Sequence, residues 1–366
     1  MGKRQTTLVQ VASTVTSQLG GPSFVVDQTS PLLDNYFDHS LIIFGNSQFE
    51  FYEAPVYNKH TFLGNRFGFF FGTLKPELRQ MIKDADILLI HGFYLFSTLI
   101  SLKISNSKRI FIMPHGSLEP YQELKSKFRK YIFRLFLLKI LRKRSFNFIV
   151  ATESEVNGVR RVFPGNKIEV VGIGVTRIAP TLNLTPFADS KVNLLSLSRI
   201  HKKKRIDISI KAVSILRGEG FECVLRIAGN GDQDLSRQLR KLVKELNLEK
   251  EVQFLGHLEQ KDKENLINKS DILLLPSENE NFAIAVAESI VRGKPVIVSS
   301  NVAMSSFVEQ HKTGIVIDSL DETLLAAKIS MMKKEYSAYQ EKCLESASLL
   351  YWPKVFEKWV QVLRNE

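Results

Sequence analysis

Apolar residues gather in short runs of strand length along the chain, and longer stretches with helical spacing of apolar positions separate these runs. Short apolar runs between turn residues predict buried strands, whereas apolar positions three or four residues apart predict amphipathic helices. The first series of predicted strands is Thr7–Ala12, Ser40–Phe44, Ile87–His91, Ile110–Pro114 and Phe148–Thr152. A second series follows Pro180 and comprises Asn193–Leu197, Val224–Ala228, Val252–Leu255, Ile272–Leu275 and Val296–Val298.

This alternation predicts βαβ units, and such units build parallel sheets of the α/β class. Two series predict two Rossmann-like domains, which we expect at residues 1–180 and 181–345, followed by a C-terminal helix within 346–366. The irregular stretch 181–190 is the expected linker. Because ligands bind at the carboxyl ends of parallel strands, two sheets facing each other would leave a cleft for a two-substrate reaction.

The composition fits a globular protein of this size. Of the 366 residues, 44% are hydrophobic, which is enough for two cores. The two cysteines, Cys223 and Cys343, lack metal-binding spacing and fit a reducing cytosol better than a disulfide-built secreted protein. No apolar run has the length of a secretory signal or a membrane span. We therefore expect a cytoplasmic protein that is either soluble or peripheral on the inner face of the plasma membrane.

Positive charge exceeds negative charge, with 50 Lys and Arg against 38 Asp and Glu. An excess of +12 favours an anionic partner, which could be nucleic acid, an anionic membrane surface or a phosphorylated substrate. Residues 123–145 hold nine of these basic residues and one acid, with aromatic and aliphatic residues between them. This segment predicts a helix that lies on anionic lipid, or an ordinary domain helix with one buried face and one basic outer face.

Two acids attract attention near the end of the second series. Glu280 precedes an apolar run that contains Glu288, eight positions further on. We expect a helix from about Phe282 to Arg292, with Gly293 as its cap. Its N-terminus would favour a bound anion such as a diphosphate, and the buried acid could accept hydrogen bonds from a ribose diol. The alternative is a core helix whose acid forms an ion pair with a neighbouring element.

The stretch "SENENFAIAVAESIVRGKPV" resembles the Glu-x7-Glu motif of family 4 retaining glycosyltransferases, which have the GT-B fold. The resemblance implies that Glu280 contacts a donor sugar and that Glu288 holds the ribose of a nucleotide sugar. Asn281, Phe282 and Ala283 follow Glu280 as further expected donor-binding residues, and Asn281 and Ala283 stand where the family pattern has glycine. In this fold the last helix crosses back to pack on the first domain, and we expect the same here.

The stretch "LSLSRIHKKKRIDISIKA" also resembles a family segment, in which an Arg and a Lys face the leaving diphosphate. Arg199 and Lys204 fall on these positions, although Lys203 differs from Lys204 by only one register. Cations there would stabilise charge that develops on the diphosphate. Ser198 and Arg205 replace glycines of the family pattern. The alternative is a solvated basic turn.

Glycines after two predicted strands complete the expected donor site. Gly229, in "LRIAGNGDQD", resembles a family glycine near the nucleotide, and a plain turn is the alternative. Gly20 and Gly21 follow the first strand and resemble the loop that faces the donor phosphates.

Two histidines stand at or just after the ends of predicted strands in the first domain, each followed by glycine. The resemblance implies that His115 contacts the donor sugar, and His91 is the less favoured candidate for this role.

No cofactor and no required metal are expected. The spacings Asp84-x-Asp86 and Asp232-x-Asp234 imitate a metal site, but the first lies where a helix ends and the second where a helix begins. The resemblance to GT-B transferases likewise implies chemistry without a metal.

The sequence therefore predicts a retaining glycosyltransferase that uses a nucleotide-diphosphate sugar. From the family alone we expect a glycan or polyprenyl-linked acceptor and a role in bacterial surface polysaccharide or lipopolysaccharide assembly. A nucleotide-sugar 2-epimerase shares the fold, but the Glu-x7-Glu spacing disfavours it. A nicotinamide dehydrogenase needs Gly-x-Gly-x-x-Gly, and neither "GIGVTR" nor "GNGDQD" supplies the third glycine. A nucleic-acid-binding protein would explain the charge, but the basic residues concentrate in one helix and one turn.

Overall fold

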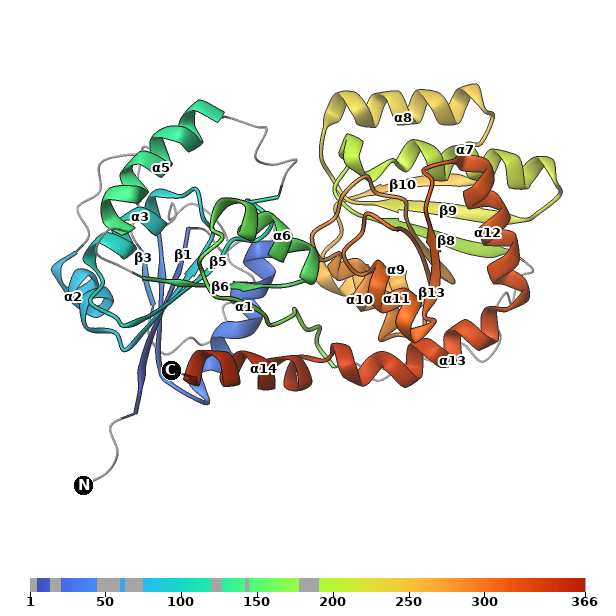
Figure 1. Cartoon of the computed structure of the whole chain (residues 1–366). Helices are drawn as coiled ribbons and strands as arrows, with labels where there is room; N and C mark the ends of the chain where they lie inside the picture. Colours follow the sequence, from blue (N-terminus) through green and yellow to red (C-terminus); the bar gives the residue numbers. More distant parts are fainter. Residues whose placement is uncertain are drawn as a thin grey trace. The chain divides into compact units, whose positions relative to one another are not determined.

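The computed structural model describes residues 5–13, 21–44, 60–62, 75–119, 127–141, 145–177 and 191–365 (Figure 1). The chain divides into two compact units. One comprises residues 1–172 together with 356–366, and the other comprises residues 173–355. The expected linker 181–190 lies outside the described residues.

The first unit is built on a seven-stranded parallel sheet with the order β3-β2-β1-β4-β5-β6-β7. Its strands are β1 (Thr7–Ala12), β2 (Asp38–Ile43), β3 (His60–Phe62), β4 (Ile87–His91), β5 (Arg109–Met113), β6 (Asn147–Val150) and β7 (Ile168–Val170). Its helices are α1 (Gly21–Asp34), α2 (Pro76–Asp84), α3 (Phe96–Ile104), α5 (Lys127–Leu141) and α6 (Glu153–Val162).

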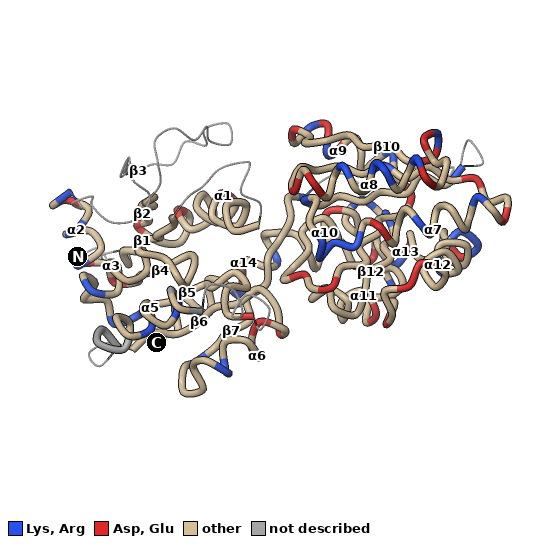
Figure 2. Tube along the Cα trace, turned by 90° about the horizontal axis from the view of Figure 1, so that it is seen from above, with Lys and Arg blue, Asp and Glu red and all other residues tan. Residues whose placement is uncertain are grey.

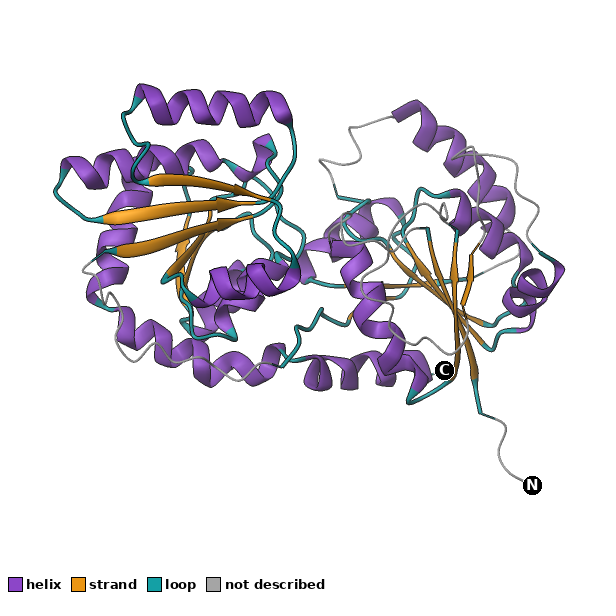
Figure 3. Ribbon diagram, turned by 180° about the vertical axis from the view of Figure 1, so that it is seen from behind, coloured by secondary structure: helices purple, strands orange, loops and turns teal. Residues whose placement is uncertain are grey.

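Helices cover both faces of this sheet, as Figure 3 shows. Apolar side chains of α2, α3, α5 and α6 pack on one face around Phe93 and Phe148. On the other face, α1 places Val26 against Leu41 and Ile43. The strand order reverses between β1 and β4, and open parallel sheets bind ligands outside the carboxyl ends of their strands at such a point.

The second unit contains a six-stranded parallel sheet with the order β10-β9-β8-β11-β12-β13. Its strands are β8 (Val192–Leu197), β9 (Cys223–Ala228), β10 (Val252–Gly256), β11 (Ile272–Leu275), β12 (Val296–Ser299) and β13 (Gly314–Ile317). Its helices are α7 (Ile206–Gly218), α8 (Gln233–Glu245), α9 (Gln260–Asn268), α10 (Ile284–Ile290), α11 (Ser305–His311), α12 (Glu322–Lys334) and α13 (Tyr336–Ser346), with 3-10 turns η1 (Lys202–Lys204) and η2 (Ala347–Leu350).

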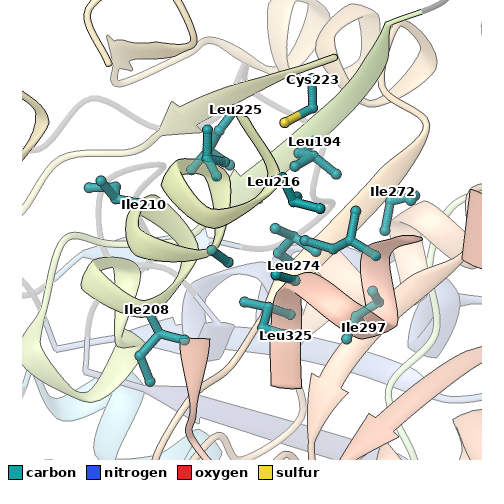
Figure 4. Close-up of a cluster of buried hydrophobic side chains, with 14 of the residues drawn as sticks. Leu194, Ile208, Ile210, Leu216, Cys223, Leu225, Ile272, Leu274, Ile297 and Leu325 are labelled. Atoms are coloured by element: carbon teal, nitrogen blue, oxygen red, sulfur yellow. The ribbon is translucent and has the colours of Figure 1, made fainter. Parts of the chain in front are cut away.

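The core of this unit consists of aliphatic side chains from neighbouring strands (Figure 4). Leu194, Leu225 and Leu274 face helices α7, α8 and α12, and all three are fully buried. The strand order reverses between β8 and β11, which is the point where a sheet of this kind is expected to bind its ligand. Figure 2 shows charged residues of both signs along the outer helix α8.

The last helix, α14 (Trp352–Arg364), belongs from residue 356 onward to the first unit. Trp359 is fully buried there, and its indole N–H donates to the carbonyl of Gly172 at 3.1 Å. Arg109 reaches the carbonyl of Leu363 at 3.5 Å. The expectation that the final helix returns to the first domain is therefore confirmed.

The chain passes between the units at 172/173 and at 355/356, rather than at the expected positions 180/181 and 345/346. The reason is a pairing of the two passing segments. Val175 donates its N–H to Leu350 at 2.8 Å, and its carbonyl accepts from the N–H of Trp352 at 3.1 Å. These hydrogen bonds join the two segments to each other, and both segments belong to the second unit.

All ten predicted strands are present, with ends that differ from the prediction by at most two residues. Three further strands were not predicted: β3, β7 and β13. Each has only three or four residues and lies at or next to an edge of its sheet. Such short segments carry too little periodicity to be distinguished from loops.

Candidate functional site

The loop after β11 carries the first of the two acids. Glu280 is fixed by its backbone, because its N–H donates to Asn301 at 3.2 Å and its carbonyl accepts from Ala303 at 3.0 Å. The helix that follows is shorter than predicted, since α10 begins at Ile284. Ala283 has a φ of 70°, which a helix interior does not allow, so Phe282 and Ala283 belong to the turn.

Glu280 forms an ion pair with Lys204, and both side chains are largely buried. Lys204 ends the 3-10 turn η1 after β8, whereas Glu280 follows β11. These two strands are neighbours at the point where the strand order reverses. Two residues predicted from separate motifs therefore meet at the position where an open parallel sheet binds its ligand.

Positive charge is concentrated beside this pair. Burial lowers the pKa of the Lys204 ammonium to about 7, and the charges of Arg199 and Lys203 act in the same direction. Arg199 itself is exposed to solvent. Lys203 contacts other residues than Lys204 does. Its ammonium donates to Asn279 at 3.1 Å, and its carbonyl accepts from the N–H of Glu278 at 2.8 Å. Both lysines hold the loop that carries Glu280.

Glu288 is buried in α10, and its carboxylate pairs with Lys263 of α9 at 2.7 Å. The structure thus shows the ion pair with a neighbouring element that the alternative for this acid expects. Lys263 was not among the predicted site residues, because a pairing between two helices leaves no spacing in the sequence. A carboxylate has about four lone-pair sites, so one lysine leaves it able to accept from a ribose diol. The ribose role of Glu288 stays a prediction.

Position 229 requires glycine for a structural reason. Its φ is 129°, and a Cβ there would lie 2.1 Å from the carbonyl oxygen of Ser198. Gly231 is confined in the same way by the carbonyl of Ile200. The glycine loop after β9 therefore packs directly on the backbone that carries Arg199, and a contact with the nucleotide stays a prediction.

In the first unit, His91 and His115 come together. His91 is the last residue of β4 and is buried, and its Nδ1 lies 2.9 Å from Nε2 of His115. Their rings stack with centroids 5.2 Å apart. Burial lowers the pKa of His115 to about 4, and burial and the neighbouring His115 and His39 lower the pKa of His91. Gly20 lies outside the described residues, and Gly21 is the first residue of α1.

The loop that holds His115 is fixed by an acid that the sequence analysis did not single out. His115 has a φ of 52° and Gly116 a φ of 74°, both in the left-handed region. Glu155 accepts the N–H of Gly116 at 2.5 Å and the N–H of Ala151 at 2.8 Å. One buried carboxylate thereby joins the loops after β5 and β6. Only its place in the first turn of a helix beside a predicted strand could have indicated this role.

The two Asp-x-Asp spacings have structural partners. Asp86 accepts from the backbone and hydroxyl of Thr7, and Asp232 caps α8 by accepting the N–H groups of Asp234 and Leu235. Within the described ranges, no three His, Cys, Asp or Glu residues are grouped so that they could hold a metal ion.

Comparison with known proteins shows what the second unit is similar to. Residues 185–348 match the family model described as glycosyl transferases group 1. Over these residues the second unit is therefore similar to group 1 glycosyltransferases. The amylovoran biosynthesis glycosyltransferase AmsK of Erwinia amylovora is 27% identical over 257 residues, which span 66% of this chain and 60% of AmsK.

Solved structures show that the similarity of fold extends to the first unit. Sucrose-phosphate synthase from Thermosynechococcus elongatus gives a TM-score of 0.75 at 16% identity, with 98% of both chains covered. Anabaena HepE, solved in complex with UDP and glucose, gives 0.72 at 15% identity, with 98% of this chain and 99% of HepE covered. The chain has the GT-B fold.

At two of the four positions where the family pattern has glycine, the backbone shows what a glycine would do there. Arg205 and Ala283 both adopt the left-handed region, with φ of 47° and 70°. Glycine reaches this region without strain, whereas other residues strain the backbone. The backbone strain at Arg205 is partly offset, because its guanidinium donates a hydrogen bond to Asp207 at 3.0 Å.

Proposed function

We propose that this chain transfers a sugar, with retention of configuration and without a required metal, from a nucleotide-diphosphate sugar to a glycan or lipid-linked acceptor. The similarity to AmsK, named for amylovoran biosynthesis, supports bacterial surface polysaccharide assembly as the pathway. The observation that carries the proposal is the Lys204–Glu280 pair at the strand-order reversal of a unit similar to group 1 glycosyltransferases.

Each of the site residues has a separate role in the proposed reaction. Lys204 and Arg199 stabilise negative charge on the departing diphosphate, and Glu280 orients the sugar beside them. Glu288 accepts hydrogen bonds from the ribose, while Lys263 holds its carboxylate in place. In the first domain, His115 binds the sugar. No side chain of this set is assigned the role of a covalent nucleophile.

Calorimetric binding tests the nucleotide site. UDP, GDP, ADP and NAD are titrated into the wild type with and without EDTA, and UDP comes first because the solved neighbour HepE was crystallised with it. We expect one nucleoside diphosphate to bind equally well with EDTA. Glu288→Gln should weaken that binding about tenfold or more, because the ribose loses a charged acceptor.

Two further variants distinguish ribose binding by Glu288 from a purely structural role of this residue. Lys263→Met removes the partner of Glu288 but no proposed ribose contact, and Glu309→Ala changes an exposed acid on α11. A purely structural ion pair would give equal losses of stability in Glu288→Gln and Lys263→Met and no specific loss of nucleotide affinity. That result, or the absence of nucleotide binding by the wild type, would contradict the proposal.

A separate experiment tests whether the reaction retains the anomeric configuration of the donor sugar. Once calorimetry has chosen the base, nucleotide sugars with that base are incubated with the enzyme, and the sugar first released is observed by proton NMR. Retention predicts that it keeps the anomeric configuration of the donor. Release of the opposite anomer would contradict retention, and formation of an isomerised sugar in place of transfer would favour the epimerase.

We also propose that α5 attaches the enzyme to an anionic membrane surface. Five large hydrophobic side chains at positions 128, 131, 132, 135 and 136 follow one face of this helix and are 38–75% exposed. They are half of the exposed large hydrophobic residues in the part of the chain that the structure describes. The opposite side of α5 buries Phe133 and Leu137. The outer face is thus apolar within a strongly basic segment, which suits an interface of anionic lipid.

No helix among the described residues is long and apolar enough to cross a bilayer. Sedimentation with vesicles of phosphatidylglycerol and phosphatidylethanolamine tests attachment at the surface. We expect binding that weakens in Phe128→Ser/Phe136→Ser and persists in a Leu349→Ser control, which changes an exposed hydrophobic residue elsewhere. Equal binding of both variants, or equal binding to phosphatidylcholine vesicles, would contradict the assignment of α5.

A further inference from the structure

A chain of buried polar side chains leads from α1 to His115 through the centre of the first sheet. Gln10 is fully buried on β1, and its amide nitrogen lies 2.9 Å from Nε2 of His91. Its amide oxygen lies 3.0 Å from Nε2 of His39, whose Nδ1 lies 2.7 Å from the carboxylate of Asp34. The His91–His115 contact extends this chain to the loop after β5.

Along this series of buried side chains, the donor and the acceptor of each hydrogen bond can be assigned. The hydroxyl of Thr29 donates to the carbonyl of Val25 at 2.7 Å, so it accepts from the NH2 group of Gln10 at 3.2 Å. This contact orients the Gln10 amide, and the same NH2 group then donates to Nε2 of His91. An Nε2 that accepts carries no proton, so neutral His91 holds its proton on Nδ1 and donates it to Nε2 of His115.

We propose that His91 and Gln10 are positioning residues that fix His115 in the tautomer with its proton on Nδ1. His115 then presents a donor at its remaining ring nitrogen, and its Nε2 is committed to His91. The lowered pKa values of both histidines agree with neutral rings at pH 7. The role in catalysis rests on the proposed function, in which His115 binds the donor sugar, whereas the tautomer itself can be measured without substrate.

Nitrogen-15 NMR of histidine-labelled protein tests the assignment directly. The seven histidines are distinguished by single His→Asn variants, and chemical shifts report which nitrogen of each ring carries hydrogen. We expect the wild type to show His115 protonated on Nδ1, the less stable form for a free side chain. Gln10→Met and His91→Leu should move the proton to Nε2. A wild-type spectrum with His115 protonated on Nε2 would overturn the proposal even if every variant failed to fold.

Kinetics then distinguish positioning from a purely structural role. An Asn at position 91 can place an amide N–H near the place of Nδ1, so His91→Asn should keep the donor that His91→Leu loses. We expect His91→Leu to lower kcat about 10- to 100-fold with little change in the donor KM, and His91→Asn to restore most of it. His311→Asn is the control variant in the other unit. Equal kcat in His91→Leu and wild type would refute positioning, whereas a wild type that binds no nucleotide would refute the proposed function alone.

Discussion

Ala283 shows at the scale of one residue how the local backbone and the family pattern are connected. The methyl group of Ala283 is buried at the start of α10, in a left-handed conformation where glycine is the usual residue. The sequence alone shows that glycine is missing, but not that the backbone keeps the conformation that glycine would adopt. Glu280, three residues before Ala283, is fixed by its backbone pairing with the loop after β12, through Asn301 and Ala303.

Ala283→Gly should therefore stabilise the protein slightly. Relief of a left-handed alanine contributes about 1–2 kcal/mol, and the greater freedom of glycine in the unfolded chain removes about 0.4–1 kcal/mol of that gain. We expect a net increase of about 1 kcal/mol in the free energy of unfolding, measured by denaturant titration. Ala283→Val should lose stability, since a β-branched residue tolerates this region poorly. A loss of stability in the glycine variant would show that the turn is not strained.

Lys204 gives a prediction that depends on pH. Burial lowers its pKa to about 7, whereas the carboxylate of Glu280 favours the charged form, so part of the side chain is neutral at pH 8 in the free protein. A bound diphosphate favours the charged form, and binding at pH 8 should therefore take up protons. Calorimetry in two buffers of different ionisation enthalpy measures this uptake. It should shrink at pH 6, where the lysine is already charged, and disappear in Lys204→Met.

At the scale of elements, the sequence predicts what is periodic or locally spaced. Long apolar runs identified the central strands, and the eight-residue spacing identified the helix with Glu288. The sequence predicted only some of the residues that pair with the site acids. Lys204 was predicted from its own motif, whereas Lys263 and Glu155 act across elements that meet only in the folded chain. Side-chain pairing of that kind depends on sheet order, which apolar periodicity does not encode.

Lys294, between α10 and β12, is an element-scale feature with a measurable cost. Its side chain is 1% exposed, and its ammonium has no hydrogen-bond partner within the described ranges. Burial lowers its pKa, although Asp271 raises it in part. Lys294→Met should therefore increase the free energy of unfolding at pH 7 by about 1 kcal/mol or more, since an apolar side chain replaces a buried unpaired charge.

The pH dependence of that gain follows from the same shift. Because the folded pKa of Lys294 lies below its unfolded value of about 10.4, the unfolded state binds more protons between the two values, and wild-type stability rises with pH in that window. The stability difference between Lys294→Met and wild type should consequently narrow from pH 7 to pH 9.5 in denaturant titrations. A difference that does not change with pH would mean that the lysine is charged and solvated in the native state.

At the scale of the whole molecule, two passing segments connect the units, and a glycine permits their close approach. A Cβ on Gly174 would lie 2.7 Å from the Cα of Trp352 and 2.8 Å from its backbone nitrogen. Neighbouring backbone groups form the Val175 hydrogen bonds to Leu350 and Trp352. The sequence gives no indication of this contact, because the two segments are far apart in the chain.

Gly174→Ala should separate these segments. Backbone atoms cannot move aside as a flexible side chain does, so we expect a loss of about 1–3 kcal/mol in the free energy of unfolding. Hydrogen exchange should accelerate at the amides of Val175 and Trp352, which lose their partners when the segments move apart. Gly165→Ala is a matched control, because a Cβ at that position meets no atom within 4 Å. If both variants had wild-type stability and exchange, the close pairing of the two segments would not contribute to holding the chain together.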